Sequence, residues 1–353
     1  MINLISRRRA LAVGGVACVA SILGGCGAVS ARPGLYVRGQ ESAPRWIDDT
    51  TGAPAWSPNS ETLAWGDEHG LRVWNSSSEV VSLRVNGPVV GRPTWSPDSA
   101  AVAFLNPDSR ELQRVDIDSG EVKRLASSFD GIEGVIRPPI LTRGGPTWSP
   151  DGASIAFVCW DGYGDELCVV GQDGSNREQL TALGIAEERA GAAARSSVTG
   201  MAWSPDSEAI AVAVQAEQQG ASAGIYRVEV RERAGERLTK LTSNAPLIWD
   251  GVTNTFIFSS RVEGRSDVYR LSAAGGKPEV LTASLADGAH DPAIDDVGDL
   301  AVISGNKIAI LRPDSPDVVF FEEPGLAGAA PALSGDGGRL AFLSLPRPIE
   351  RYP

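Results

Sequence analysis

The sequence predicts an all-β protein, a seven-bladed β-propeller made of four-stranded antiparallel blades. Three observations predict it: a short motif recurs along the chain, its copies stand 39 to 55 residues apart, and further short apolar runs follow each copy. The 353 residues, of which 42% are apolar and 22% charged, are enough for one toroid of this kind. Forty glycines and 23 prolines indicate many turns and therefore many short strands.

The recurring motif is Trp-Ser-Pro followed by Asp or Asn, with a second short apolar run a few residues later. Four close copies have their tryptophans at Trp56, Trp95, Trp148 and Trp203. Three weaker copies are centred on Trp249, Ile294 and Leu333. Ser-Pro-Asp suits a tight turn, because proline fixes φ at about −65° and the Gly or Ser that follows accommodates the exit. Each unit therefore begins with two strands, and we expect the motif tryptophans to pack between neighbouring blades.

A third and a fourth strand are expected further along each unit. Third strands are predicted at 71–74 and 268–271, among others, and fourth strands at 179–181 and 280–282. These runs are rich in β-branched and aromatic residues, which favour strands. Four antiparallel strands per unit make a propeller blade.

The units resemble those of the TolB-like, WD-repeat-like β-propellers. The resemblance extends over nearly all of the chain that follows the first 33 residues. It implies the fold and much less about the function, because the same blade occurs in binding modules, in gating domains of peptidases and in lyases. Both a binding protein and an enzyme therefore stay open.

The two ends of the chain are expected to share the last blade. The seventh unit supplies only its first two strands before Pro353, whereas residues 34–38 and 44–47 have the pattern of a third and a fourth strand. Pairing the two ends completes one blade and leaves no sheet edge unpaired, which would otherwise favour aggregation. We therefore expect seven blades, closed by residues 35–47. A ring of six blades is the alternative, because the last three copies of the motif are degenerate.

The first residues have the order of an export signal. Three arginines, Arg7–Arg9, precede an uncharged stretch of mostly apolar or small residues at 10–23. This stretch is too short to span a bilayer, which needs about 20 apolar residues, and it is typical of a signal peptide. We expect the signal peptide to cover residues 1–25, with export by either the Sec or the twin-arginine route.

Residues 23–26, Leu-Gly-Gly-Cys, resemble the bacterial lipobox. The resemblance implies that Cys26 is lipidated, with acyl chains such as palmitate, and becomes the mature N-terminus. We expect a lipidated tether at 26–33 and a propeller over 34–353. Two or three acyl chains hold a protein on a membrane almost permanently. The predicted location is the extracytoplasmic face of the cell membrane, in the periplasm or at the cell surface.

Two of the four cysteines remain once Cys18 of the leader and the lipid site are set aside. Cys159 and Cys168 lie on the predicted second and third strands of the third blade, and an antiparallel hairpin brings such positions opposite each other. Disulfides persist in exported proteins, so we predict a Cys159–Cys168 bond. We expect no metal and no cofactor. The acidic turns at 116–121 and 161–166 leave calcium as a weak alternative, since neither has the twelve-residue spacing of a calcium loop.

Charged residues lie where the chain enters the first strands of three units. In a propeller these connections gather around the central channel, so the candidate binding residues are Arg92, Arg143, His290 and Asp291. A histidine beside a carboxylate can orient a substrate. A solvated turn would place the same residues there, and that interpretation stays open.

Two functions fit these observations. The first is a non-enzymatic, monomeric scaffold on the membrane that binds another envelope protein, a peptide or a glycan; no residue is assigned a catalytic role. The alternative is a lyase or glycoside-acting enzyme with its active site at the mouth of the channel. The formal net charge of −12 argues against nucleic acid as a partner, since phosphate binding needs clustered cations.

Overall fold

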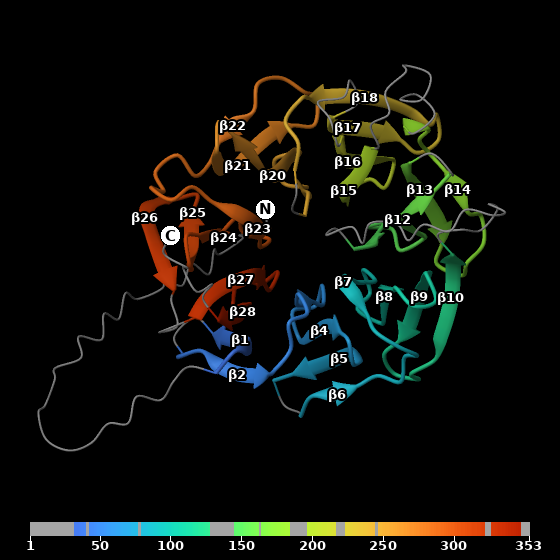
Figure 1. Ribbon diagram of the computed structural model, residues 1–353, viewed down its shortest axis with the longest axis horizontal. Helices are drawn as coiled ribbons and strands as arrows, with labels where there is room; N and C mark the ends of the chain where they lie inside the picture. The colour runs from blue at the N-terminus through green and yellow to red at the C-terminus, as the bar shows by residue number, and fades with distance from the viewer. Residues whose placement is uncertain are drawn as a thin grey trace, which may run out of the picture.

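The structure is a ring of seven sheets (Figure 1). The computed structural model describes residues 32–39, 42–76, 79–127, 145–161, 164–183, 196–216, 223–243, 246–321 and 326–346. Each sheet has four antiparallel strands and forms one blade. The predicted all-β class and seven-bladed ring are therefore confirmed, and the six-bladed alternative is wrong. In the described part of the chain, no helix is long and apolar enough to cross a membrane.

Blades 1 to 4 follow the chain, each with its first strand innermost (Figure 1). Blade 1 consists of β3 (Ala55–Trp56), β4 (Thr62–Asp67), β5 (Gly70–Asn75) and β6 (Val81–Ser82). Blade 2 consists of β7 (Val90–Trp95), β8 (Ala101–Asn106), β9 (Glu111–Asp116) and β10 (Val122–Ser127). Blade 3 consists of β11 (Thr147–Trp148), β12 (Ser154–Trp160), β13 (Asp165–Gly171) and β14 (Glu178–Gln179). Blade 4 consists of β15 (Ser196–Trp203), β16 (Ala209–Ala216), β17 (Gly224–Glu229) and β18 (Ala234–Thr239).

Blades 5 to 7 complete the ring. Blade 5 consists of β19 (Ile248–Asp250), β20 (Thr255–Val262), β21 (Arg265–Ser272) and β22 (Glu279–Val280). Blade 6 consists of β23 (His290–Ile294), β24 (Leu300–Ser304), β25 (Lys307–Arg312) and β26 (Ser315–Phe321). Blade 7 combines both ends of the chain, in the order β27 (Leu326–Leu333), β28 (Arg339–Pro346), β1 (Gly34–Gly39) and β2 (Arg45–Asp48).

The predicted closure by the N-terminal strands is confirmed. β1 pairs with β28 along its whole length, from Gly34 opposite Ser344 to Gly39 opposite Arg339. The ring of Tyr36 stacks on that of Phe342, its partner in the register, with centroids 5.6 Å apart. β2 then pairs with β1 and becomes the outer strand of the blade. Because β1 and β2 come from the N-terminal end of the chain and β27 and β28 from the C-terminal end, their pairing in this blade closes the ring.

The motif tryptophans join each blade to the one before it. Three indole Nε1 groups donate hydrogen bonds to the preceding first strand, from Trp56 to Ala332 O at 3.1 Å, from Trp95 to Ala55 O at 3.0 Å and from Trp203 to Thr147 O at 2.9 Å. Trp148 differs, because its Nε1 donates to Gly152 O of its own turn at 3.2 Å. The expected packing between blades is therefore present, and a hydrogen bond accompanies it at three of the four joints.

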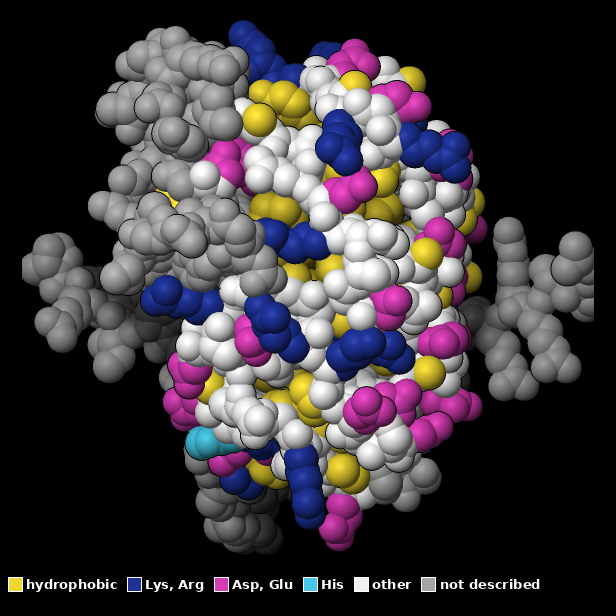
Figure 2. Space-filling model, turned by 90° about the vertical axis from the view of Figure 1, so that its right-hand side faces the viewer, with side chains coloured by type: hydrophobic (Ala, Val, Ile, Leu, Met, Phe, Trp, Pro, Cys, Tyr) yellow, Lys and Arg dark blue, Asp and Glu magenta, His cyan; other side chains and the backbone are white. Residues whose placement is uncertain are grey.

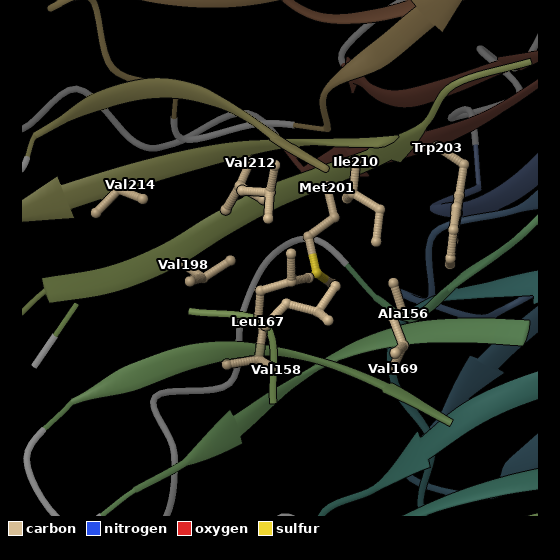
Figure 3. Packing of buried hydrophobic residues seen from close by; sticks show 12 residues of the cluster. Ala156, Val158, Leu167, Val169, Val198, Met201, Trp203, Ile210, Val212 and Val214 are labelled. Carbon is tan, nitrogen blue, oxygen red and sulfur yellow. The ribbon is translucent and has the colours of Figure 1, made fainter. Parts of the chain in front are cut away.

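Apolar side chains fill the space between adjacent blades. Figure 3 shows the joint between blades 3 and 4, where Val158 and Leu167 of blade 3 face Val198 and Met201 of blade 4. The β-branched residues of β16 add Val212 and Val214, which are 1% and 0% exposed. Such packing makes the ring a rigid frame for the connections at its two faces.

The two faces of the disc carry different connections. The motif turns, such as 96–101, lie where the first strands end, on what we call the turn face. Neighbouring turns are linked there, since Asn59 N donates to Ser99 Oγ at 3.1 Å and Asp151 N donates to Ser207 Oγ at 3.1 Å. The opposite face, where the first strands begin and where the hairpins between second and third strands lie, we call the mouth face.

The rim carries mixed charge. On the side shown in Figure 2, basic and acidic side chains lie close to one another, and hydrophobic side chains appear as small separate spots. Ion pairs on the outer strands include Arg124 with Glu111 at 2.9 Å and Arg233 with Glu178 at 2.8 Å. In its described part, this side therefore offers neither a broad basic surface nor a broad apolar one.

Candidate binding site at the channel mouth

One position in each unit distinguishes two blades from the other five. It lies three residues before the motif tryptophan or its counterpart, where the chain enters the first strand. In five units the residue there is small or a proline: Ala53, Gly145, Gly200, Pro246 and Ala330. In blades 2 and 6 it is charged, as Arg92 in β7 and Asp291 in β23. When the seven units are aligned, a charged residue at this position is therefore the sequence signal that distinguishes Arg92 and Asp291 from the other candidate binding residues, Arg143 and His290.

A β-bulge interrupts the first strand at this position in both blades. The register of β7 against β8 shifts between Val90 and Thr94, and that of β23 against β24 shifts between His290 and Ala293. Asp291 has φ of +51°, a left-handed value that aspartate tolerates better than most residues. A bulge leaves a residue outside the ladder pairing and re-aims its side chain. Local backbone geometry therefore sets both charged residues apart from the regular strand.

Arg92 reaches past blade 1 to blade 7. Its Nη2 donates a hydrogen bond to Pro331 O in β27 at 3.1 Å. Its buried Nε has no hydrogen-bond acceptor among the described residues. Burial lowers the pKa of Arg92, and the negative charge of the nearby Asp291 opposes that shift. The backbone of Arg92 lies close to Gly145, which precedes the first strand of blade 3. A Cβ at position 145 would lie 2.1 Å from Arg92 O, so only glycine fits at that position. A cation with an unused donor therefore lies near a carboxylate from another blade.

His290 accompanies the carboxylate. Its Nδ1 lies 3.3 Å from Asp291 Oδ2, and the two side chains are 49% and 39% exposed. The structure thus brings Arg92 near Asp291, and Asp291 to His290. Arg143 and Cys26 lie outside the described residues. Among the residues that are described, no group of three or more His, Cys, Asp or Glu side chains is placed to hold a metal ion.

The sequence Gly-Ala-Ser-Ala-Gly at 220–224 has the spelling of a nucleophile elbow. A nucleophile elbow joins a strand to a helix. Here the segment lies between β16 and β17, two antiparallel strands of one hairpin, and its serine lies outside the described residues. The context is therefore not that of a hydrolase nucleophile.

Cys159 and Cys168 form the predicted disulfide, with Cα atoms 5.8 Å apart. The two cysteines are not directly opposite each other, because Cys159 pairs with Glu166 and Cys168 with Phe157. The expectation of a directly opposed pair is therefore wrong: the register of β12 against β13 offsets the cysteines diagonally. The bond ties together the two central strands of blade 3.

Replacing both Cys159 and Cys168 by serine is expected to lower the free energy of unfolding by about 2–3 kcal/mol, because the bond restricts a short loop of the unfolded chain. Urea titration of the double variant measures this loss. Wild-type protein titrated under reducing conditions is the control and should unfold at a similarly lowered urea concentration. An unchanged midpoint in both samples would contradict a stabilising bond.

A pair of buried acids beside the disulfide was not anticipated. Asp165 and Glu166, the first residues of β13, are 3% and 0% exposed. Glu166 Oε2 accepts a hydrogen bond from Thr181 Oγ1 at 2.5 Å. Asp165 Oδ2 has no partner among the described residues. Burial, with the adjacent Glu166 charge adding to it, raises the pKa of Asp165 to about 7. The sequence signal for this buried pair was the presence of two adjacent acidic residues at the start of an otherwise apolar strand.

A cavity of about 460 Å³ lies between blades 3 and 4. Its wall is mainly apolar and is lined by Leu180, Leu183, Val212, Val214, Tyr226 and Val228. Arg233 also lines it and is paired with Glu178. The cavity has the size of a small-molecule site, but its charged group is already neutralised by an ion pair. The channel mouth is therefore the stronger candidate for recognition.

The sequence matches no model of a known protein family and no curated protein. Solved β-propellers are similar in structure. TolB from Acinetobacter baumannii matches with a TM-score of 0.48 and 17% identity over 83% of this chain and 63% of that chain, so this chain spans less than two thirds of it. A putative TolB from Agrobacterium tumefaciens matches with a TM-score of 0.53 and 17% identity, covering 81% of this chain and 99% of that chain.

An enzyme is also among the structural neighbours. Oligogalacturonate lyase from Vibrio parahaemolyticus matches with a TM-score of 0.58 and 10% identity, covering 90% of this chain and 99% of that chain. At such low identities the similarity concerns the fold alone. The protein is thus a seven-bladed propeller consistent with the TolB-like kind, and its structural neighbours include a putative TolB and a lyase.

Proposed function

We propose that the protein is an extracytoplasmic scaffold, held on the cell membrane by acyl chains on Cys26, that binds a polypeptide segment at the channel mouth. The observation that carries the proposal is the proximity of the positive charge of Arg92 to the carboxylate of Asp291, two residues that lie in the first strands of different blades. The lipobox-like segment at 23–26 and the leader before it support the anchor. The protein acts as a monomer and requires neither cofactor nor nucleic acid.

The site suits a ligand that carries both an acceptor and a donor. A carboxylate or a backbone carbonyl of the ligand accepts a hydrogen bond from the guanidinium group of Arg92, while an amine or amide donates to Asp291. Hydrogen bonds to charged groups are the strong ones, and partial burial increases their strength further. A polypeptide supplies both kinds of group along its backbone and at its termini, which is why a peptide segment is the preferred ligand.

Replacing Arg92 by methionine is expected to weaken peptide binding by about 10- to 100-fold, because it removes a charge-assisted hydrogen bond and keeps most of the side-chain volume. Peptides are first selected from a random library on the mature wild-type protein, and their dissociation constants are then measured by calorimetry. Asp291→Asn should weaken the same peptides, by less, because an amide can still accept one hydrogen bond.

The matched control is Arg231→Met, which removes an exposed arginine from the turn between β17 and β18. It should leave peptide affinity unchanged. If the selected peptides bind Arg92→Met as tightly as wild type, the site lies elsewhere on the propeller. If the protein selects no peptides but binds sugars on a glycan array through Arg92, the ligand is a glycan and the peptide assignment is wrong.

A lyase or glycoside-acting enzyme is the second candidate, favoured by the contact of His290 with Asp291 beside Arg92. A carboxylate that orients a histidine, next to an arginine that can bind an acid group, suits proton abstraction from a uronate sugar. The test uses oligogalacturonate and follows the unsaturated product by ultraviolet absorbance. Turnover that is abolished in His290→Ala would establish the enzyme, whereas peptide binding that survives His290→Ala, with no turnover by wild type, favours the scaffold.

A further inference from the structure

We infer that the mouth face is the surface that the propeller turns toward the membrane, so that the segment bound at Arg92 belongs to a protein of the same membrane. This inference rests on the proposed acylation of Cys26. It adds an orientation, which the anchor alone does not determine, because a tethered disc could lie on either face or stand on its rim.

The first strand of the described chain, β1, begins on the mouth face. Gly34, the first residue of β1, pairs with Ser344 near the end of β28, and Ser344 in turn pairs with Gly328 near the start of the first strand β27. First strands begin on the mouth face by definition. The N-terminal end of β1 therefore lies on the same face as the entry to β7, where Arg92 is found.

Contacts with blade 7 fix the point at which the tether leaves. Tyr36 Oη donates a hydrogen bond to Arg32 O at 2.6 Å, and Trp46 Nε1 donates to Pro33 O at 3.3 Å. The Arg32 guanidinium lies over the Trp46 ring, 3.8 Å from its centroid. Arg32 and Pro33 are thus part of the blade and do not lengthen the tether.

The remaining tether is too short for the disc to lie on its other face. From Cys26 to Arg32 the chain makes six residue steps, which span at most about 20 Å when fully extended. The eight residues of β20, which cross the disc from the turn face to the mouth face, span about 26 Å. A tether that starts on the mouth face therefore cannot pass around the rim and reach a membrane lying against the turn face.

The gap between the mouth face and the bilayer limits what can enter it. A folded domain of 100 residues has a radius of gyration of about 13 Å, so its width is more than about 26 Å. This exceeds the ~20 Å that the tether allows between the mouth face and the bilayer. An extended segment, whose strand-like chain needs only about 10 Å, fits the gap. The partner is accordingly an extended, membrane-proximal stretch of a protein that is itself held in or on this membrane.

Energy transfer from labelled cysteines to the membrane surface tests the orientation. The lipidated full chain is placed in phosphatidylcholine vesicles whose headgroups carry an energy acceptor. Donor labels are attached to Val252→Cys or Val262→Cys, two exposed valines, of which Val252 lies in the turn before β20 at the turn face of blade 5 and Val262 ends β20 at the mouth face. Cys159 and Cys168 stay in their disulfide. We expect the label at 262 to lie closer to the membrane than the label at 252, by about 25 Å.

A second pair of labelled variants, in another blade, controls for tilt of the disc relative to the membrane and for misfolding of a single variant. Ser109→Cys and Ser119→Cys flank β9 in blade 2, again on the mouth face and the turn face. The same sign of difference in both blades supports the inference. Equal distances within each pair would mean that the disc stands on its rim, and the reverse order would mean that it lies on its turn face; either result overturns the orientation. A mass spectrum without acyl chains on Cys26 would instead overturn the proposed anchor and this inference together.

Discussion

Replacing Trp95 by alanine is expected to lower the free energy of unfolding by about 3–5 kcal/mol, the usual cost of truncating a large buried aromatic residue. Trp95 is 6% exposed and packs in a cluster that draws Leu71 and Val73 from blade 1 and Phe104 from blade 2. Its Nε1 donates to Ala55 O at 3.0 Å. The substitution therefore empties the joint between two blades and leaves a carbonyl oxygen without its donor.

Urea unfolding followed by circular dichroism measures this loss, and Trp95→Phe separates its two parts. Phenylalanine keeps most of the apolar contact but cannot donate to Ala55 O, so it should cost about 1–2 kcal/mol. A loss below 1 kcal/mol for Trp95→Ala would show that the indole is not the residue that holds the joint together.

Replacing Asp165 by asparagine is expected to stabilise the protein at pH 8 by about 2–4 kcal/mol and to leave stability unchanged near pH 4. Asp165 is buried, and although its carboxylate accepts a hydrogen bond from the Val198 amide, desolvation and the Glu166 charge raise its pKa to about 7. In the unfolded chain the pKa is about 3.9. The folded state thus holds a proton that the unfolded state has lost, and the stability of the wild type falls as pH rises from about 4 to 7.

Asparagine does not ionise, so the variant avoids that loss and its advantage should be complete above pH 7. The measurement is the free energy of unfolding in urea at pH 4, 6 and 8 for both proteins. Asp173→Asn is the control, because hydrogen bonds from Ser175 lower the pKa of this exposed carboxyl and the substitution should not stabilise at any pH. Parallel pH profiles for wild type and Asp165→Asn would contradict a buried, proton-bound Asp165.

Much of the fold was predictable because its information is local. The Trp-Ser-Pro turns recur with little change, so each copy of the motif predicts the first two strands of a blade. The closure at Tyr36 and Phe342 was also predictable, since an incomplete last unit and two unpaired strands at the start complement each other. The positions of the strands followed from apolar runs between turn residues, and these runs depend only on neighbouring residues.

The candidate site was predictable as residue types but not as an arrangement. Arg92 and Asp291 were identified because both precede a first strand, yet nothing in their immediate sequence relates them, since they lie in blades 2 and 6. They lie near each other because the ring brings blades 6, 7, 1 and 2 around one channel, and a bulge interrupts the first strand at each residue. The diagonal placement of Cys159 and Cys168 likewise depended on the register of a hairpin, which a difference of one or two residues would change.

The sequence alone predicted seven blades, with six as the alternative, and the way in which the ring closes, because turns and apolar runs are short-range features that repeat. Tertiary structure alone decided that Asp165 is buried against Val198 of the next blade, that Arg92 Nη2 reaches Pro331 O two blades away, and that the chain emerges on the mouth face. These properties arise from burial and from the approach of residues far apart in the chain, and both exist only once the blades have packed around a common axis.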